Sequence, residues 1–285
     1  MREPGDPSFA RRASASALTI ARRAALGMLA LLAGCGGGVP LMHPAQTLKQ
    51  GDIRAEAGFS ANVALGGFSS AISAAEADTG GGGGPPPQAA SDPTFAKGAV
   101  AEAAVGPALA PYAGARVGVG QQFEGGLVYT GRAVRADIRR AFDLGPHWAL
   151  SLGAGGSAVL YGQQNEGALA QLHGWGADVP VLLGYQSDGG LYMLWVGARG
   201  GWEHVDISDL TSEPKTVTLG TPPAVLSATR WWGGGVLGFA VGFRHLHVAL
   251  ELDAAYATIN GSYNQTSVQV DGFSLAPAAA LWWDF

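Results

Sequence analysis

The chain contains 285 residues, of which 45 are glycine and only 14% are charged, and its formal net charge is −5. Its hydrophobic fraction of 47% is too high for a disordered chain, and its glycines lack the three-residue period of collagen. The negative charge provides no basic surface for nucleic acid, and a single cysteine excludes a disulfide framework and a cysteine-built zinc site.

The first 34 residues have the organisation of a bacterial export signal. A basic lead of arginines precedes an uncharged run at 24–33, which is too short to span a membrane as a stable helix. The run ends in the sequence LAGC, which resembles the bacterial lipobox. This resemblance implies that Cys35 is acylated, with palmitate as a suitable label, and becomes the mature N-terminus. An ordinary signal peptide followed by a chance cysteine is the alternative.

The region after Cys35 divides into a tether and a folded domain. Residue 36 is glycine rather than the aspartate that marks inner-membrane retention in such lipoproteins, so the resemblance implies an anchor on the periplasmic side of the outer membrane. The stretch GGGVPLMHPAQT is typical of a short flexible tether. We therefore predict a signal peptide at 1–34, a lipid-anchored tether at 35–48 and a folded domain at 49–285.

Beyond the tether, apolar residues alternate with polar or small ones along most of the chain. In the segment LHVALELDAAY at 246–256, every even position is apolar and the odd positions hold His, Glu, Asp or Ala. This period of two indicates strands with one apolar face. We predict ten strands, with eight as the alternative. The ten segments are 50–65, 110–120, 123–131, 133–143, 147–161, 171–186, 190–205, 226–243, 246–260 and 266–285.

The connections between these segments alternate between tight turns and longer loops. Those at 66–109 and 206–225 are long, and 162–170 is intermediate. Short turns on one side and long loops on the other are typical of bacterial outer-membrane barrels. The predicted fold class is therefore all-β, an antiparallel transmembrane β-barrel with surface loops at 66–109 and 206–225. An even number of strands places both termini on the same, periplasmic side.

The apolar face carries aromatic residues near the strand ends, as in the interfacial girdles of outer-membrane barrels. The chain closes on Trp283-Asp284-Phe285, and an alternating strand that ends in an aromatic residue resembles the C-terminal signal of these proteins. The resemblance implies that the barrel-assembly machinery recognises Trp283 and Phe285. A soluble sandwich is the alternative, but its polar face would carry many lysines, and this chain has three.

If the apolar face meets lipid, the opposite face lines the lumen. Buried charges persist only when they are paired and hydrogen-bonded, and barrels of about eight to ten strands are narrow enough for side chains to fill. The sequence therefore predicts a lumen closed by a charge network, with a narrow channel as the alternative. The charged residues predicted to face inward are Asp52, Arg54, Glu56, Arg116, Arg135, Asp137, Arg139, Asp178, Arg199, Glu203, Arg230, Arg244, Glu251 and Asp253.

Candidate catalytic and metal-binding residues are few. His204, Asp206 and Asp209 lie where a predicted strand leaves the membrane. Omptin-type outer-membrane proteases place Asp and His pairs at such a rim, but no omptin motif matches residue by residue. His245 and His247 have the spacing to chelate a metal from one strand face, yet polar residues at a turn end are the favoured interpretation.

We therefore predict no enzyme activity, no metal and no cofactor. The favoured role is structural or surface-binding through the long loops, with outer-membrane lipid as a partner and no nucleic acid. A channel for small solutes is the second hypothesis, and a rim hydrolase is the third.

Overall fold

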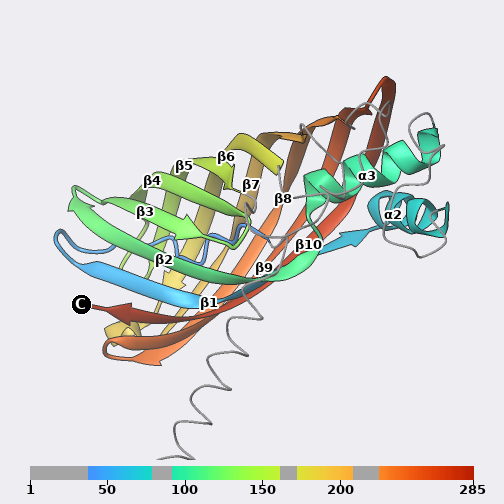
Figure 1. The fold of residues 1–285 in the computed structure, drawn as a ribbon. Helices are drawn as coiled ribbons and strands as arrows, with labels where there is room; N and C mark the ends of the chain where they lie inside the picture. Colours follow the sequence, from blue (N-terminus) through green and yellow to red (C-terminus); the bar gives the residue numbers. More distant parts are fainter. Residues whose placement is uncertain (1–37, 79–91, 161–171, 208–224) are drawn as a thin grey trace, which may run out of the picture.

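The computed structural model describes residues 38–78, 92–160, 172–207 and 225–285, which form one closed barrel with two added helices (Figure 1). Each strand pairs antiparallel with its neighbours in sequence, and β1 pairs with β10 to close the barrel. The prediction of ten antiparallel strands is confirmed. The strands are β1 Ile53–Leu65, β2 Ala108–Gly120, β3 Phe123–Tyr129, β4 Ala133–Asp143, β5 Trp148–Leu160, β6 Leu172–Gln186, β7 Tyr192–Ile207, β8 Leu226–Phe243, β9 Leu246–Tyr263 and β10 Thr266–Asp284.

The two ends of the barrel differ. One end, called the turn end below, holds Phe285 and the connections β2–β3, β4–β5, β6–β7 and β8–β9. The opposite end, called the loop end, holds the helices α2 (Gly67–Asp78) and α3 (Pro93–Val105), as Figure 1 shows. Short turns face the periplasm in outer-membrane barrels, so the turn end corresponds to the periplasmic side.

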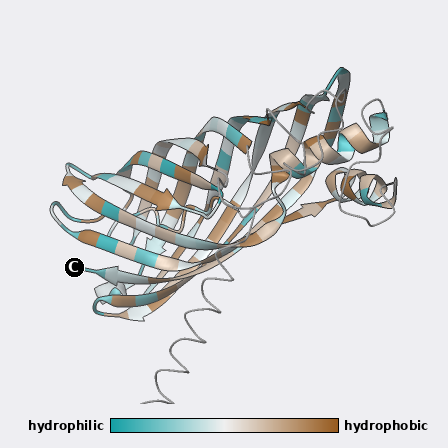
Figure 2. Ribbon diagram, in the orientation of Figure 1, coloured by the Kyte–Doolittle hydropathy of each residue, from teal (hydrophilic) through white to brown (hydrophobic). Residues whose placement is uncertain are grey.

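The outward positions of the strands are apolar and exposed. On β9, Leu250 is 53% exposed, whereas its neighbour Glu251 is 4% exposed because it points into the lumen. Figure 2 shows this change of hydropathy along the strands. A soluble protein of this size does not expose an apolar belt on every side, so the outer surface is suited to lipid.

Aromatic rings mark both edges of the apolar belt. On β7 the outward residues Tyr192 and Trp202 are ten positions apart, and the same spacing separates Tyr185 from Trp175 on β6. Ten residues of a strand tilted by about 40° rise about 25 Å, which is the usual height of the lipid-facing band. The aromatic residues therefore lie at the two interfaces of a membrane.

The predicted surface loop at 66–109 contains the two helices, which the sequence analysis did not predict. α3 has an N-cap, because the Asp92 side chain accepts a hydrogen bond from the Thr94 N–H at 2.8 Å, and it ends at Gly106, whose φ of 59° is left-handed. Val100 is fully buried against Ile259 and other inward residues of the loop end. Among the described helices, none is long and apolar enough to cross a membrane.

Residues 38–48 lie inside the barrel, which differs from the flexible tether expected at 36–47. Leu41, Met42 and Ala45 are fully buried. They pack with inward aromatic residues, among them Trp195 and Trp282, whose rings stack with centroids 5.8 Å apart. We call residues 38–48 the lumen segment. Its burial arises from contacts with the barrel wall, which composition does not reveal.

Candidate functional site

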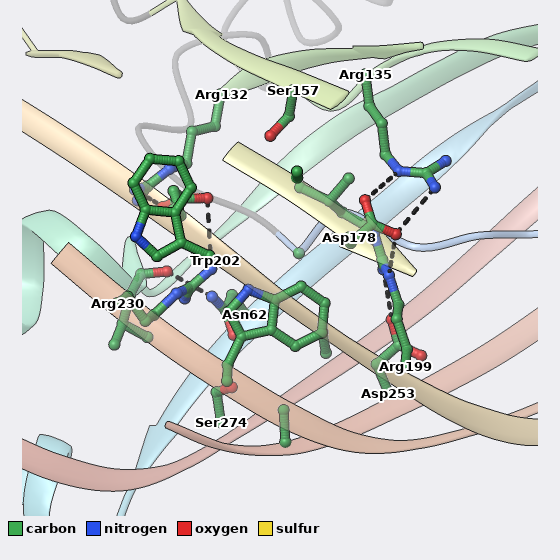
Figure 3. Close-up of a pocket in the computed structure, with 18 residues that line it drawn as sticks. Asn62, Arg132, Arg135, Ser157, Asp178, Arg199, Trp202, Arg230, Asp253 and Ser274 are labelled. Atoms are coloured by element: carbon green, nitrogen blue, oxygen red, sulfur yellow. Dashed lines mark hydrogen bonds and ion pairs between the residues drawn. The ribbon is translucent and has the colours of Figure 1, made fainter. Parts of the chain in front are cut away.

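A line of ion pairs crosses the middle of the lumen, centred on Asp178 of β6 (Figure 3). The Asp178 carboxylate accepts from Arg135 Nε at 2.8 Å and from Arg199 Nε at 2.9 Å. Arg199 Nη1 also lies 3.3 Å from Asp253 Oδ2 on β9. Asp178 and Arg199 lie on neighbouring strands, whereas Arg135 reaches Asp178 across β5 and Arg199 reaches Asp253 across β8.

The line continues on the other side of Arg135. Arg135 and Arg116 both bind Asp137, and the Arg116 Nη2 to Asp137 Oδ1 distance is 2.5 Å. Arg116 also binds Glu124, which accepts from Arg139 Nη2 at 2.9 Å. The side chains of all of these groups are at most 3% exposed, so each carboxylate depends on arginine partners in place of water. The arginine fork suits this task because it donates in two directions at once.

Glycines opposite the arginines provide the necessary space. A Cβ atom at Gly155 would lie 2.3 Å from Arg135 Nη2, and one at Gly126 would lie 2.5 Å from Arg116 Nη1. Any larger residue at these two inward positions would displace a guanidinium from its carboxylates. The high glycine content of the chain is therefore linked at these positions to the charge network.

The lumen segment is fixed from one side by Glu251. The Glu251 carboxylate accepts from the Leu41 N–H at 2.5 Å, from the Met42 N–H at 2.8 Å and from Trp195 Nε1 at 2.8 Å. Three donors thus satisfy a carboxylate that is 4% exposed. A buried acid on the barrel wall therefore binds the backbone of the segment through hydrogen bonds.

Arginines hold the carbonyl groups of the same segment. Arg139 donates to the carbonyls of Pro44, Ala45 and Gln46, at 2.9 Å for Gln46. Arg199 donates to the Val39 carbonyl. The segment is consequently bound through its backbone by residues that also belong to the ion-pair line.

At the loop end, the last turn of α3 is held by Arg132. Arg132 Nη2 donates to the Ala103 carbonyl at 2.9 Å and to the Ala104 carbonyl at 3.3 Å. A cation at a helix C-terminus satisfies free carbonyls and complements the helix dipole. Arg132 also pairs with Glu203 at 3.2 Å, so α3 is joined to the wall of β7.

A small polar cavity of about 80 Å³ lies between α3 and the lumen segment (Figure 3). Three buried polar atoms at its wall have no hydrogen-bond partner, namely Asn62 Oδ1, Arg230 Nε and Asp253 Oδ1. A cavity of this size has room for ordered water. Within the described residues, no group of His, Cys, Asp and Glu is arranged to hold a metal ion.

Most of the charged residues that the sequence assigns to the lumen are found there. Arg54 pairs with Asp284 at 2.6 Å, Arg230 pairs with Glu203 at 3.4 Å, and Glu56 accepts from the Tyr112 hydroxyl. Arg244 is the exception. It lies in the turn between β8 and β9 with a φ of 57° and is exposed, so its assignment to the lumen is wrong.

Three charged members of the lumen were missing from the predicted set: Glu124, Arg132 and Asp284. Glu124 has the same strand parity as the inward Val128, and Asp284 has that of the inward Trp282. Strand parity could therefore have found both. Arg132 lies in the turn between β3 and β4, where alternation does not apply.

His204 and Asp206 lie on the outer face at the rim. His204 Nε2 is 2.8 Å from Asp206 Oδ2, and His204 Nδ1 is 2.8 Å from Thr229 Oγ1, so both ring nitrogens have partners. His245 lies in an exposed turn and His247 is buried inside, which separates the proposed chelating pair.

Cys35 and Asp209 lie outside the described residues. Trp283 and Phe285 are exposed on the outer face at the turn end, and the Phe285 N–H donates to the Ile53 carbonyl at 2.8 Å.

No protein-family model and no curated protein matches the chain. Three similar solved structures are barrels of low sequence identity. Neisserial surface protein A is 10% identical over 82% of this chain and 96% of its own, with a TM-score of 0.32. OprG, an outer membrane protein of Pseudomonas aeruginosa, is 12% identical over 85% and 99%, with a TM-score of 0.31. The copper transporter OprC is 11% identical with a TM-score of 0.33, and the match covers 85% of this chain and 35% of OprC.

The chain has an outer-membrane β-barrel fold. This assignment stands on the closed barrel, the exposed apolar exterior and the two aromatic girdles.

Proposed function

We propose that this outer-membrane barrel does not conduct in the described conformation and acts as a structural or surface-binding protein. The observation that supports the proposal is the double closure of the lumen. α3 fills the loop end, and the lumen segment fills the half nearer the turn end. Between them, the ion-pair line centred on Asp178 crosses the barrel.

The binding surface in this proposal is the loop end. α2 lies there against α3 and the ends of β1 and β10. Its outer side includes the exposed residues Ser70 and Ser73. The second predicted loop, 206–225, lies mostly outside the described residues.

Planar-bilayer recording tests the closed lumen. We expect the mature wild-type chain to give no conductance steps, and we expect deletion of either 38–48 or 93–105 alone to leave one obstruction in place. Deletion of both segments should produce steps. Folding of each variant is checked by heat-modifiable gel mobility. Stable conductance of the folded wild-type protein would reject the proposal and support the channel alternative.

The proposal includes a lipid anchor at Cys35, which must meet one geometric condition. Gly38 lies in the middle of the barrel, where its N–H donates to the Ala61 carbonyl at 3.3 Å. The three residues from Cys35 to Gly38 span at most about 10 Å. The distance from Gly38 to the turn end is greater, because Ala276, which lies beside Gly38, is about 20 Å along the barrel axis from Asp284. An acyl chain on Cys35 therefore reaches the periplasmic leaflet only when the lumen segment leaves the lumen.

Two measurements separate the anchor from the closed lumen. Labelled palmitate should be incorporated by the wild type and not by Cys35→Ser. If the acylated form exists, its lumen segment should be accessible to protease from the periplasmic side, whereas that of Cys35→Ser should be protected. Incorporation of palmitate with a fully protected segment would contradict the geometric condition.

A further inference from the structure

A second cavity, of about 600 Å³, opens at the turn end of the barrel. One wall is formed by the part of the lumen segment nearest the turn end, Pro44 and residues 46–48, together with Lys49. The facing wall is formed by the turns at 143–148 and 186–190. Cavities of this size accommodate small molecules and short peptides. None of the interactions that close the lumen requires the cavity to be empty.

Two buried polar atoms on lining residues of this cavity lack hydrogen-bond partners. Gln46 uses its Nε2 to donate to the His147 carbonyl at 3.0 Å, but its Oε1 is unpaired. His247 is 3% exposed and its Nε2 contacts the Gly190 carbonyl at 3.0 Å, but its Nδ1 is unpaired. The nearest carboxylate oxygen to that Nδ1, on Asp284, is 3.9 Å away. Because protein encloses both atoms, an occupant of the cavity would be bound by the charged groups at its mouth.

The mouth of the cavity carries unpaired charges of both signs. Within the described residues, Lys49 and Asp52 have no ion-pair partner, and Arg244 contacts only the Phe243 ring through its guanidinium. The Asp188 side chain is 99% exposed, and its one ionic neighbour is His147 at 3.8 Å. A purely anionic or purely cationic ligand would meet repulsion from half of this set. A molecule with both charges would meet partners for each.

We propose that this cavity binds a short zwitterionic peptide. Its ammonium group would pair with Asp188 or Asp52, and its carboxylate with Lys49 or Arg244. The turn end faces the periplasm, where peptides with free amino and carboxyl groups occur both in solution and attached to the cell wall.

Titration of the mature chain in detergent micelles tests the proposal. The probe is the tetrapeptide Ala-Glu-Lys-Ala with free termini, and the control probe is acetyl-Ala-Gln-Gln-Ala-amide, which has no charges. Binding is followed by calorimetry. We expect the charged probe to bind and the neutral probe to bind much more weakly. Equal binding of the two probes, or no binding of either, would overturn the proposal.

Variants at exposed turn positions locate the site without disturbing the barrel. We expect the double variant Asp188→Asn, Arg244→Gln to weaken probe binding by about fivefold, which corresponds to two exposed ion pairs. The matched control is Asp271→Asn, Arg140→Gln, which changes the same charges on exposed residues that do not line the cavity. An equal loss in both double variants would refute the assignment to this cavity.

A second arm distinguishes the two sources of peptide. Co-sedimentation with purified cell-wall sacculi should deplete the wild type and spare the Asp188→Asn, Arg244→Gln variant if the natural ligand is attached to the wall. Binding of the free probe without co-sedimentation would assign a soluble peptide. Conductance recording is a separate measurement. A negative result for peptide binding would therefore not contradict the proposal that the lumen is closed.

Discussion

The hold of Glu251 on the lumen segment can be tested by a nearly isosteric change, Glu251→Gln. The carboxylate accepts from the Leu41 and Met42 N–H groups and from Trp195 Nε1. A glutamine has one carbonyl oxygen, so one backbone N–H would face an amide NH₂ and lose its acceptor. The remaining hydrogen bonds would lose the contribution of the charge.

The size of the effect follows from these contacts. A hydrogen bond to a charged group contributes about 1.5–3 kcal/mol, and a neutral one contributes about 1 kcal/mol. Losing one charged bond and weakening another destabilises the bound segment by about 3 kcal/mol. Because about 1.4 kcal/mol corresponds to a factor of ten, the bound state should open roughly 100-fold more often.

Amide hydrogen exchange at Leu41 and Met42 measures this opening directly. Glu203→Gln is the matched control, because Glu203 pairs with Arg132 and Arg230, and among the described residues none of its ion pairs reaches the lumen segment. We expect fast exchange at both amides in Glu251→Gln and unchanged exchange in Glu203→Gln. If the two variants exchange alike, the buried carboxylate is not what holds the segment.

Four further predictions concern the barrel and its ends. Gly155→Val should lower the free energy of unfolding in urea by about 1–3 kcal/mol, because its side chain would meet Arg135 Nη2, whereas Gly233→Val should not, since no atom lies within 4 Å of a Cβ there. Arg135→Gln should lower the free energy of unfolding by about 3–5 kcal/mol, because it breaks two buried ion pairs. Arg244→Gln should change it by no more than about 0.5 kcal/mol. Similar losses in the two variants would show that Arg244 belongs to the charge network after all. Asp92→Ala should remove the cap of α3 and speed amide exchange in its first turn by about fivefold, equivalent to about 1 kcal/mol, with Asp143→Ala as a control outside the helix. Deletion of Phe285 should reduce the amount of folded protein in the outer membrane, whereas Phe243→Ala at an exposed turn end should not; equal yields would remove the assembly role of the terminal residue.

The strands were predictable because lipid and lumen impose opposite demands on alternate residues. The strand and the inward face of the run from Leu246 to Tyr256 are predicted correctly from its own sequence, without any knowledge of the neighbouring strands. The same rule fails at Arg244, since a tight turn interrupts the alternation that its two flanking strands obey. It is also weak at Glu124, because β3 has only seven residues and two of them are glycine.

The two obstructions in the lumen were not predictable from local patterns. α3 is surrounded by protein over most of its circumference, so its sequence PTFAKGAVAEAAV lacks the polar stripe that identifies a surface helix. The lumen segment has no secondary structure that would give it a period. Its place is set by Glu251 and Arg139, which lie more than ninety positions away in sequence.

The lumen segment is bound to the barrel as a ligand would be, but it belongs to the same chain. Only residues 49–52 separate it from the first strand. A short connection of this kind keeps the effective local concentration of the segment in the millimolar range. A free peptide of the same sequence would therefore have to reach about millimolar levels before it could compete for Glu251 and Arg139, so dilute periplasmic peptides would leave the barrel closed.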